Sequence, residues 1–173
     1  MEDFLRFVSS RYSIRSYDSE KQVEQEKLLR VLEAARFAPS AANRQPWKIM
    51  VVTSVPVLEK LHLAYPAPWF AKANTVLIVK GDISQAWTRN RDGYNSINSD
   101  LAILMTHILL AAHAEGLSTC WIEAFDKEML CEALSLKETE VVCAMTPIGY
   151  HPEGEKLIRP KSRKDLDEIV EWM

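Results

Sequence analysis

The chain of 173 residues predicts an α+β fold. Segments with the apolar spacing of helices and short β-rich segments occur along the same chain, and they do not alternate strictly. Strict alternation would have favoured a doubly wound parallel sheet. The length is that of one domain, which buries about 70% of its unfolded surface and can hold a substantial core. We therefore expect residues 1–173 to form a single domain.

The first half of the chain predicts three helices and two strands. Asp3 can cap the first helix, and apolar side chains at helical spacing mark the other two. The strands are short and β-rich, and Gly81 ends the second. In order, the expected elements are a helix from Asp3 to Ser10, a helix over 26–37, a strand over 48–53, a helix over 57–64 and a strand over 75–80.

The second half is dominated by a helical pattern over 98–115 that is apolar almost all round. Such a helix belongs in the centre of a fold or in an interface. Gly116 is a natural cap for its end. The remaining expected elements are a strand over 118–122, a capped helix over 126–134, a strand over 141–148 and a short helix over 166–172.

Composition and charge exclude several classes of protein. Apolar residues make up 47% of the chain and charged residues 26%, which is typical of a globular protein, and the net charge of −3 argues against a dedicated nucleic-acid-binding protein. We expect no signal peptide, and the longest apolar run, 101–112, is too short to span a bilayer. Cys120, Cys131 and Cys143 lack metal-ligand spacing, so we expect reduced cysteines of a cytoplasmic protein.

The most informative segment reads Ala-Pro-Ser-Ala-Ala-Asn-Arg-Gln-Pro-Trp over residues 38–47. Pro39 and Pro46 prevent a continuous helix through it. Ser40, Asn43 and Gln45 place short polar side chains beside free backbone amides. Such a stiff polar link can present donors and acceptors to a flat heterocycle, although an ordinary helix-to-strand loop would have the same composition.

Two basic motifs near the ends of the chain could hold an anion. Arg11, Ser13 and Arg15 stand at alternate positions, so in an extended segment their side chains would point the same way. A second cluster over 159–164 holds four cations in six residues. Arginine suits phosphate because its planar fork donates paired hydrogen bonds. Taken singly, the first motif is better explained as a solvated basic turn, and a run like the second is usually a charged surface loop.

Other motifs are either weaker or absent. Residues 145–150 read as a strand running into Gly149, which would let a backbone approach a ligand or simply end in a turn. The sequence has no glycine-rich phosphate-binding motif, no metal-binding histidine pair and no recognisable nucleophile. His107 and His113 do not share a helix face, and we expect both to be packing or interface residues. A chain with anion motifs but no evident acid, base or nucleophile suggests that a cofactor carries the chemistry.

Taken in order, these segments resemble the nitroreductase family of FMN-dependent oxidoreductases. The resemblance runs from about residue 8 to the end of the chain, and the Pro-Ser-x-x-Asn-x-Gln-Pro-Trp segment is its most specific part. The matching segments are Arg11-x-Ser13-x-Arg15 with Tyr17, residues 28–35, residues 38–47, residues 109–121, Pro147-Ile148-Gly149-Tyr150 and residues 161–164.

The resemblance implies a nitroreductase-like fold with a central, mostly antiparallel sheet flanked by helices, in an obligate homodimer with two FMN sites at its interface. It implies that Arg11 and Ser13 face the phosphate and ribityl chain, that Arg15 approaches the pyrimidine side of the ring, and that the Pro147–Gly149 turn lies near the flavin N5, where it donates a backbone N–H. The full set of implied FMN-binding residues is Arg11, Tyr12, Ser13, Arg15, Pro147, Ile148, Gly149, Lys161 and Arg163 of one subunit with Pro39, Ser40, Ala41, Asn43 and Gln45 of the other.

The implied activity is hydride transfer from NADH or NADPH, through the flavin, to a small acceptor such as a nitroaromatic compound or a quinone. A cation at Arg15 would stabilise the reduced flavin and raise its reduction potential. Flavin fragmentation or reductive dehalogenation on the same fold, a non-catalytic flavin-binding protein and a ligand-free domain are the alternatives.

The chain is compact over 53–75 and 81–100, where longer family members place extra helices over the flavin. Asn95 and Asn98 are candidates for contacting the flavin O4/N3 edge. Four aromatic residues are candidates for a lid or for core packing, namely Trp69, Phe70, Trp87 and Tyr94.

Overall fold

The computed structural model describes residues 1–154 and 161–173. Arg159 and Pro160, which begin the second basic cluster, lie outside these residues. The described helices are α1 (Glu2–Ser10), α2 (Gln25–Ala35), α3 (Val55–Ala64), α4 (Ile97–Ala114) and α5 (Lys127–Leu134). The strands are β1 (Trp47–Val52), β2 (Val76–Asp82), β3 (Ser118–Thr119) and β4 (Glu140–Gly149), with short 3-10 turns at Ala41–Asn43, Phe70–Lys72 and Leu166–Glu168.

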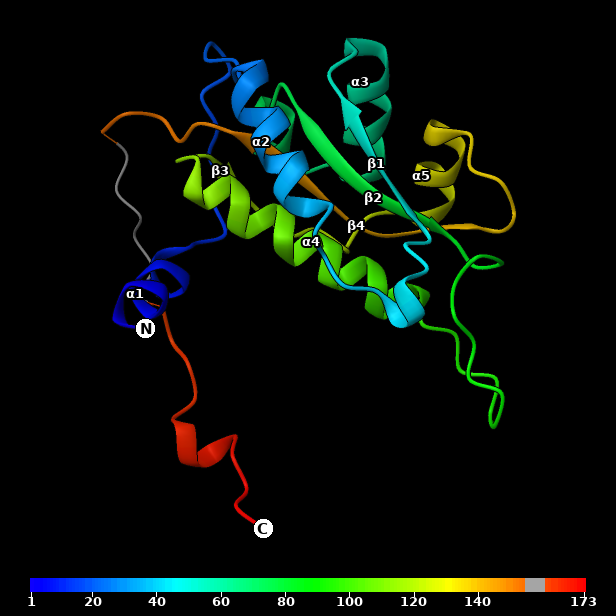
Figure 1. Ribbon diagram of the computed structural model, residues 1–173. Coiled ribbons are helices and arrows are strands. Elements are labelled where there is room, and N and C mark those ends of the chain that lie inside the picture. The colour runs from blue at the N-terminus through cyan, green and yellow to red at the C-terminus, as the bar shows by residue number, and fades with distance from the viewer. Residues whose placement is uncertain (155–160) are drawn as a thin grey trace.

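The four strands form one sheet in the order β1-β2-β4-β3, and every neighbouring pair is antiparallel. Val76 pairs with Val52 on one side and with Pro147 on the other, so β2 lies between β1 and β4. Helices cover both faces of this sheet (Figure 1). The structure confirms the expected α+β fold with an antiparallel sheet.

The core consists of two apolar layers, one on each face of β2. Leu77 and Val79 pack with α2 and α4, whereas Val76 and Ile78 pack with α3 and α5. All four of these side chains are fully buried. This arrangement explains why β2 is an unbroken β-branched and apolar run instead of an alternating one.

The α4 helix is the central support of the fold. By length and composition alone it could cross a membrane. In the structure it packs against α2 and the sheet, and eight of its residues are buried in the core. The sequence pattern therefore marks a core helix, as expected from its apolar character on nearly every side.

Two expected elements are shorter than predicted. The strand expected over 118–122 is only Ser118–Thr119, although Ile122 makes an isolated bridge with Met145. The helix expected over 166–172 is reduced to the single turn Leu166–Glu168. Most side chains of that segment are exposed, and a helix this short is not stable without an apolar face to pack against.

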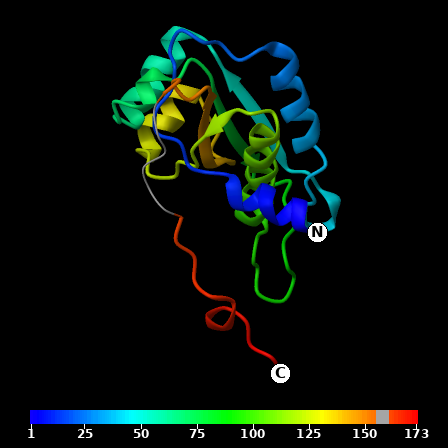
Figure 2. The same ribbon diagram turned by 90° about the vertical axis from the view of Figure 1, so that its left-hand side faces the viewer.

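The two ends of the chain stand apart from the main body. The α1 helix has no buried residue, and the C-terminal arm, residues 161–173, extends away from the sheet and its helices (Figures 1 and 2). Both carry large exposed apolar side chains, including Phe4 and Leu5 on α1 and Leu166, Ile169 and Trp172 on the arm.

Candidate functional site

The segment after α1 is extended and adds to the edge of the sheet. Ser13 makes a parallel bridge with Thr119 of β3, and the Ile14 N–H donates to the Thr119 carbonyl at 2.9 Å. Ile14 is buried, while Ser13 and Arg15 on either side of it are exposed. The alternation expected for Arg11, Ser13 and Arg15 is therefore present, because successive side chains of an extended segment point in opposite directions and every second one points the same way.

The C-terminal basic segment lies against this extended segment. The Lys161 ammonium donates to the Ser9 carbonyl and lies 4.6 Å from the centre of the Tyr12 ring. Together the two segments line a cavity of about 210 Å³, which we call the anion cavity. Its lining residues are Arg11, Tyr12, Ser13, Arg15, Lys161, Ser162 and Arg163. Two basic motifs almost 150 residues apart in the sequence thus form one site.

The anion cavity is strongly electropositive. Its lining residues include four cations and no carboxylate. One guanidinium nitrogen of Arg11 is buried and has no hydrogen-bond partner among the described residues. Burial, together with the Arg11 and Arg163 cations, lowers the pKa of Lys161. Because repelling charges and an unpaired buried donor both cost free energy, the cavity favours a ligand with several anionic oxygens.

Cys120, the residue that follows β3, is buried close to residues of the anion cavity. Burial raises the pKa of its thiol, and the nearby Arg15, Arg11 and Ser13 act in the opposite direction. This thiol therefore stays protonated and behaves as a packing group, because the thiolate is disfavoured in a buried site.

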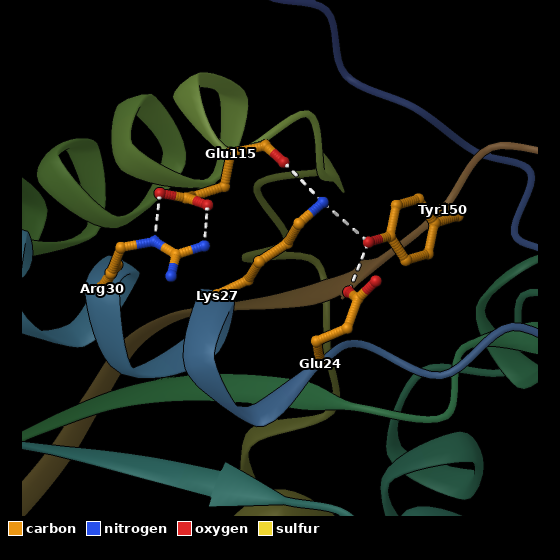
Figure 3. A network of polar contacts seen from close by, with 5 residues as sticks. All are labelled: Glu24, Lys27, Arg30, Glu115 and Tyr150. Atoms are coloured by element: carbon orange, nitrogen blue, oxygen red, sulfur yellow. Dashed lines mark hydrogen bonds and ion pairs between the residues drawn. The ribbon is translucent and has the colours of Figure 1, made fainter.

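A polar network connects α2 with the residues that follow α4 and β4 (Figure 3). The Tyr150 hydroxyl donates to the Glu24 carboxylate at 2.5 Å, and the Lys27 ammonium donates to the Tyr150 oxygen at 2.9 Å and to the Glu115 carbonyl at 3.2 Å. Arg30 forms two hydrogen bonds with the Glu115 carboxylate, at 2.7 and 2.8 Å. These bonds join α2 to the end of α4 and the end of β4.

The same network reaches the extended segment through the backbone. The Asp18 N–H donates to the Tyr150 carbonyl at 2.9 Å. The segment that carries Arg11 and Arg15 is therefore fixed at two points, at Ile14 by β3 and at Asp18 by Tyr150. Sequence patterns could not reveal this network, because its residues are spread over four separate parts of the chain.

The proline-bounded loop, residues 38–47, is tightly turned. Ala42, Asn43 and Gln45 all have positive φ, at 51°, 53° and 48°. Only a few per cent of residues other than glycine adopt this conformation, which costs about 1–2 kcal/mol. Local hydrogen bonds offset the cost, since the Gln45 N–H donates to the Ser40 hydroxyl at 2.9 Å and the Gln45 side-chain amide donates to the Asn43 oxygens.

The loop is anchored to α4 by a buried carboxylate. Asp100 is 2% exposed and accepts hydrogen bonds from the Ala41 N–H at 2.8 Å and from the Ser96 hydroxyl at 2.7 Å. This anchor was not predicted from the sequence. The available signal was the single acidic residue of an apolar helix, Asp100, four residues after Ser96. Asp100 holds Ala41 in place and leaves Pro39, Asn43 and the side chain of Gln45 exposed.

The loop and the two segments that line the anion cavity lie toward opposite ends of α4 (Figure 1). Asp100, in the first turn of α4, holds the loop, whereas Arg11 and Tyr12 of the anion cavity line a neighbouring cavity together with His113 of the last turn. The thirteen residues from Asp100 to His113 span about 20 Å of helix. Within one chain, therefore, the structure does not bring Pro39, Ser40, Ala41, Asn43 and Gln45 together with Arg11 and Lys161.

The strand expected over 141–148 is present as β4, and the Pro147–Gly149 turn that the resemblance implied is part of this strand. These three residues are the buried end of β4 and pair with β2 and β3. The Ile148 N–H already donates to the Thr75 carbonyl at 3.0 Å, and Pro147 has no N–H. The prediction of a turn was wrong, because β3 and Thr75 supply pairing partners that the sequence did not show. Gly149 is needed here for close packing, since a Cβ atom would lie 3.2 Å from the Tyr17 ring.

The remaining candidates divide between core and surface. Phe70 is fully buried and belongs to the core, and Trp69 packs against Tyr65 and Phe70. Tyr94 is 43% exposed on the loop between β2 and α4. The Asn95 side-chain amide donates to the Ile83 carbonyl and to the Thr88 hydroxyl. Asn95 therefore serves its own loop in this structure.

Comparison with protein families identifies the chain. The model of the nitroreductase family matches residues 8–64 and 56–150. The chain belongs to the nitroreductase family. This result confirms the resemblance inferred from the motifs.

Comparisons with individual relatives support the family assignment. The chain is 40% identical to the major NAD(P)H-flavin oxidoreductase of Aliivibrio fischeri, over 94% of the chain and 95% of the relative. A nitroreductase family protein from Clostridium difficile 630 has the same fold, with a TM-score of 0.87 and 31% identity over 98% of this chain and 97% of that one. A protein from Exiguobacterium sibiricum 255-15, solved in complex with FMN, matches with a TM-score of 0.85 and 22% identity over 98% and 97% of the two chains.

The anchoring of the loop by Asp100 is testable by an isosteric change. Asp100→Asn keeps the shape but removes one of the two hydrogen-bond acceptors. We expect a loss of about 1–3 kcal/mol in the free energy of unfolding, because a buried donor loses its charged partner. Urea denaturation followed by circular dichroism measures it.

Asp92→Asn is the matched control for this change. Asp92 pairs with Arg89 on an exposed loop, where about half of each side chain is accessible. We expect an effect below about 1 kcal/mol there. Equal stability of Asp100→Asn and Asp92→Asn would show that the anchor is not important.

Proposed function

We propose that this chain is an NAD(P)H-dependent FMN oxidoreductase that works as a homodimer. The anion cavity is the observation that carries the proposal. Four cations and a buried guanidinium nitrogen without a partner among the described residues match a dianionic phosphate. The family assignment and the flavin in the name of the Aliivibrio fischeri relative support FMN as the molecule that carries this phosphate.

The residues of the cavity have distinct proposed roles. Arg11, Lys161 and Arg163 bind the phosphate, with Ser13 as an additional hydroxyl donor and Tyr12 packing beneath the Lys161 ammonium. Arg15 lies at the exposed side of the cavity, on the same face as Ser13. We assign Arg15 to the pyrimidine end of the ring, where a cation stabilises negative charge.

When bound, FMN supplies the redox chemistry by accepting a hydride from NADH or NADPH at N5 and passing two electrons to a small acceptor such as a nitroaromatic compound or a quinone. The chain's own residues bind and orient the cofactor and set the electrostatic potential around it. No acid, base or nucleophile of the chain is required for this activity.

A dimer explains the placement of the proline-bounded loop. The loop and the anion cavity lie at opposite ends of α4, so one chain does not close both around a single ring. In a dimer with two-fold symmetry, the loop of each subunit can reach the cavity of the other. Pro39, Ser40, Ala41, Asn43 and Gln45 then complete the partner's site.

The exposed ends of the chain supply an apolar surface for this dimer. Phe4 and Leu5 on α1 are more than half exposed, and Trp172 at the end of the arm is 92% exposed. Side chains of this size are seldom left in contact with water when they occur as a group. We propose that α1 and the arm pack against the partner subunit. The whole of 1–173 then forms one FMN-binding domain, and the three free cysteines suit a cytoplasmic location.

The cofactor assignment is tested first by the colour of the purified protein. We expect absorption bands of flavin that remain with the protein on gel filtration and are released on denaturation. Arg163→Ala should weaken FMN binding at least about tenfold, because a charge-assisted bond to phosphate contributes about 1.5–3 kcal/mol. Quenching of FMN fluorescence gives the Kd, and Lys60→Ala, at an exposed position on α3, is the control. Unchanged affinity in Arg163→Ala would contradict the assigned role.

The role of Arg15 is tested by the reduction potential of the bound flavin. Arg15→Ala removes a cation that stabilises the anionic reduced form, so the potential should fall by about 30 mV, the equivalent of a tenfold change for two electrons. Spectroelectrochemical titration measures the shift, with Lys164→Ala as the control for a neighbouring charge outside the cavity lining. A reduction potential equal to that of the parent would show that Arg15 does not act on the flavin ring.

The dimer is tested at the arm. Light scattering on the full chain should give the mass of a dimer, and Trp172→Asp should shift it towards the monomer and lower FMN retention together. Leu63→Asp, at an exposed apolar position on α3, is the matched control and should leave both unchanged. A monomeric parent that binds FMN with full affinity would overturn the proposed assembly.

Steady-state oxidation of NADH and NADPH with menadione or nitrofurazone tests the reaction itself. Turnover with either donor supports the proposed activity. Stable FMN binding without turnover of either donor would favour a different flavin reaction on the same fold.

A further inference from the structure

His113 lies in the last turn of α4, close enough to Arg11 and Lys161 of the anion cavity for their charges to act on it. A second cavity of about 240 Å³ is lined by Ser10, Arg11, Tyr12, His113 and His151, among others. It shares Arg11 and Tyr12 with the anion cavity. His113 is therefore connected to the anion cavity through Arg11 and Tyr12, which line both cavities.

A hydrogen bond connects His113 to the residue before Arg11. Its Nε2 lies 2.7 Å from the Ser10 hydroxyl oxygen. The Ser10 hydroxyl itself donates to the Phe7 carbonyl at 2.8 Å, so the proton between Ser10 and His113 belongs to the imidazole. The Phe7 ring also packs on the imidazole, with the ring centres 5.1 Å apart.

These contacts matter because, together with the bond from Lys161 to the Ser9 carbonyl, they hold the last turn of α1. The helix has no buried residue, and Arg11 follows immediately at its end. The position of the Arg11 side chain thus depends on where the last turn of α1 lies. His113 fixes that turn against α4.

We propose that His113 is a positioning residue of the phosphate site, which holds Arg11 in place through Ser10 and whose protonation is coupled to the anion in the cavity. The identity of the anion as the FMN phosphate rests on the proposed function. The coupling itself rests on the geometry of His113, Ser10 and Arg11.

The charges around His113 determine the sign of the coupling. Arg11 at the end of α1 and Lys161 of the arm both face it, and His151 lines the same cavity after β4. On α4 itself, Glu115 lies two residues away, and its carboxylate is paired with Arg30. Burial, Arg11 and Lys161 lower the pKa of His113.

An anion bound between Arg11 and Lys161 offsets their charge, so the pKa of His113 rises in the complex. A group with a higher pKa in the complex takes up a proton on binding. Its contribution to affinity therefore increases as the pH falls through its titration range. Protonated histidine keeps its Nε2–H, so the bond to Ser10 persists. The phosphate's own second ionisation, near pH 6, acts in the opposite direction.

The direct test is an NMR titration of the histidine ring protons of the apoprotein, with inorganic phosphate as the probe. The four histidines of the chain are few enough to assign by single substitutions. We expect the pKa of His113 to be higher in phosphate than in chloride at the same ionic strength. His107, on another part of α4, should not respond. A His113 pKa that is identical in the two salts would overturn the coupling.

Two variants separate the positioning role from the charge. His113→Ala loses the bond to Ser10, so FMN should bind about threefold to tenfold more weakly at neutral pH. His113→Gln can still donate to Ser10 but does not titrate, so it should restore most of the affinity. The pH dependence of Kd between about pH 5.5 and 8 should differ from the parent in both variants and in the same direction.

His107→Ala is the control on the same helix, and its Kd should follow the parent at every pH. FMN affinity in His113→Ala that equals the parent's would show that His113 does not position Arg11. A parent that binds phosphate with the expected His113 shift but does not bind FMN would refute the proposed function and leave the positioning role standing.

Discussion

The convergence of like charges at the anion cavity is the constraint on which the site depends. Arg11, Arg15, Lys161 and Arg163 line one small space, no carboxylate belongs to that lining, and one nitrogen of Arg11 is buried without a partner among the described residues. Such an arrangement costs free energy in the isolated chain, since each cation repels the others and the buried donor is unsatisfied. A fold that holds these residues in place is prepared for an anion, whose binding recovers that free energy.

The rest of the fold supplies the rigidity that this arrangement needs. The sheet edge at Thr119 holds Ile14, and Tyr150 holds Asp18. These two bonds keep the extended segment beside the cations of the C-terminal segment, although their charges repel. The network of Glu24, Lys27 and Tyr150 joins these points to α2 and α4. Asp100, at the far end of α4, holds the proline-bounded loop in a conformation that its residues would not adopt unaided. One apolar helix thus supports both halves of the proposed flavin site, which are separated by its length and which the proposed second subunit would join.

Patterns that depend on neighbouring residues were predictable, and contacts between distant residues were not. The strand over β2 and the helix over α4 follow from apolar composition, and the common direction of Arg11, Ser13 and Arg15 follows from the two-residue repeat of an extended segment. The prediction of a helix over 166–172 was wrong, because the apolar side chains of this segment are exposed within one chain and do not stabilise a short helix. The turn at Pro147–Gly149 was wrong because strand pairing with Thr75 and Ser118 is a tertiary property. His113 and Asp100 were missed as parts of the site because their partners, Ser10 and Ala41, lie 103 and 59 residues away.

The central claim is that the paired basic segments bind a phosphate group, and the most direct test compares two ligands that differ only in that group. The affinities of the purified apoprotein for FMN and for riboflavin, measured by fluorescence titration in the same buffer, isolate the contribution of the anion cavity. We expect FMN to bind at least about 100-fold more tightly, since two charge-assisted hydrogen bonds already account for that ratio. Equal affinity for the two flavins would show that the convergence of charges has no part in binding the cofactor.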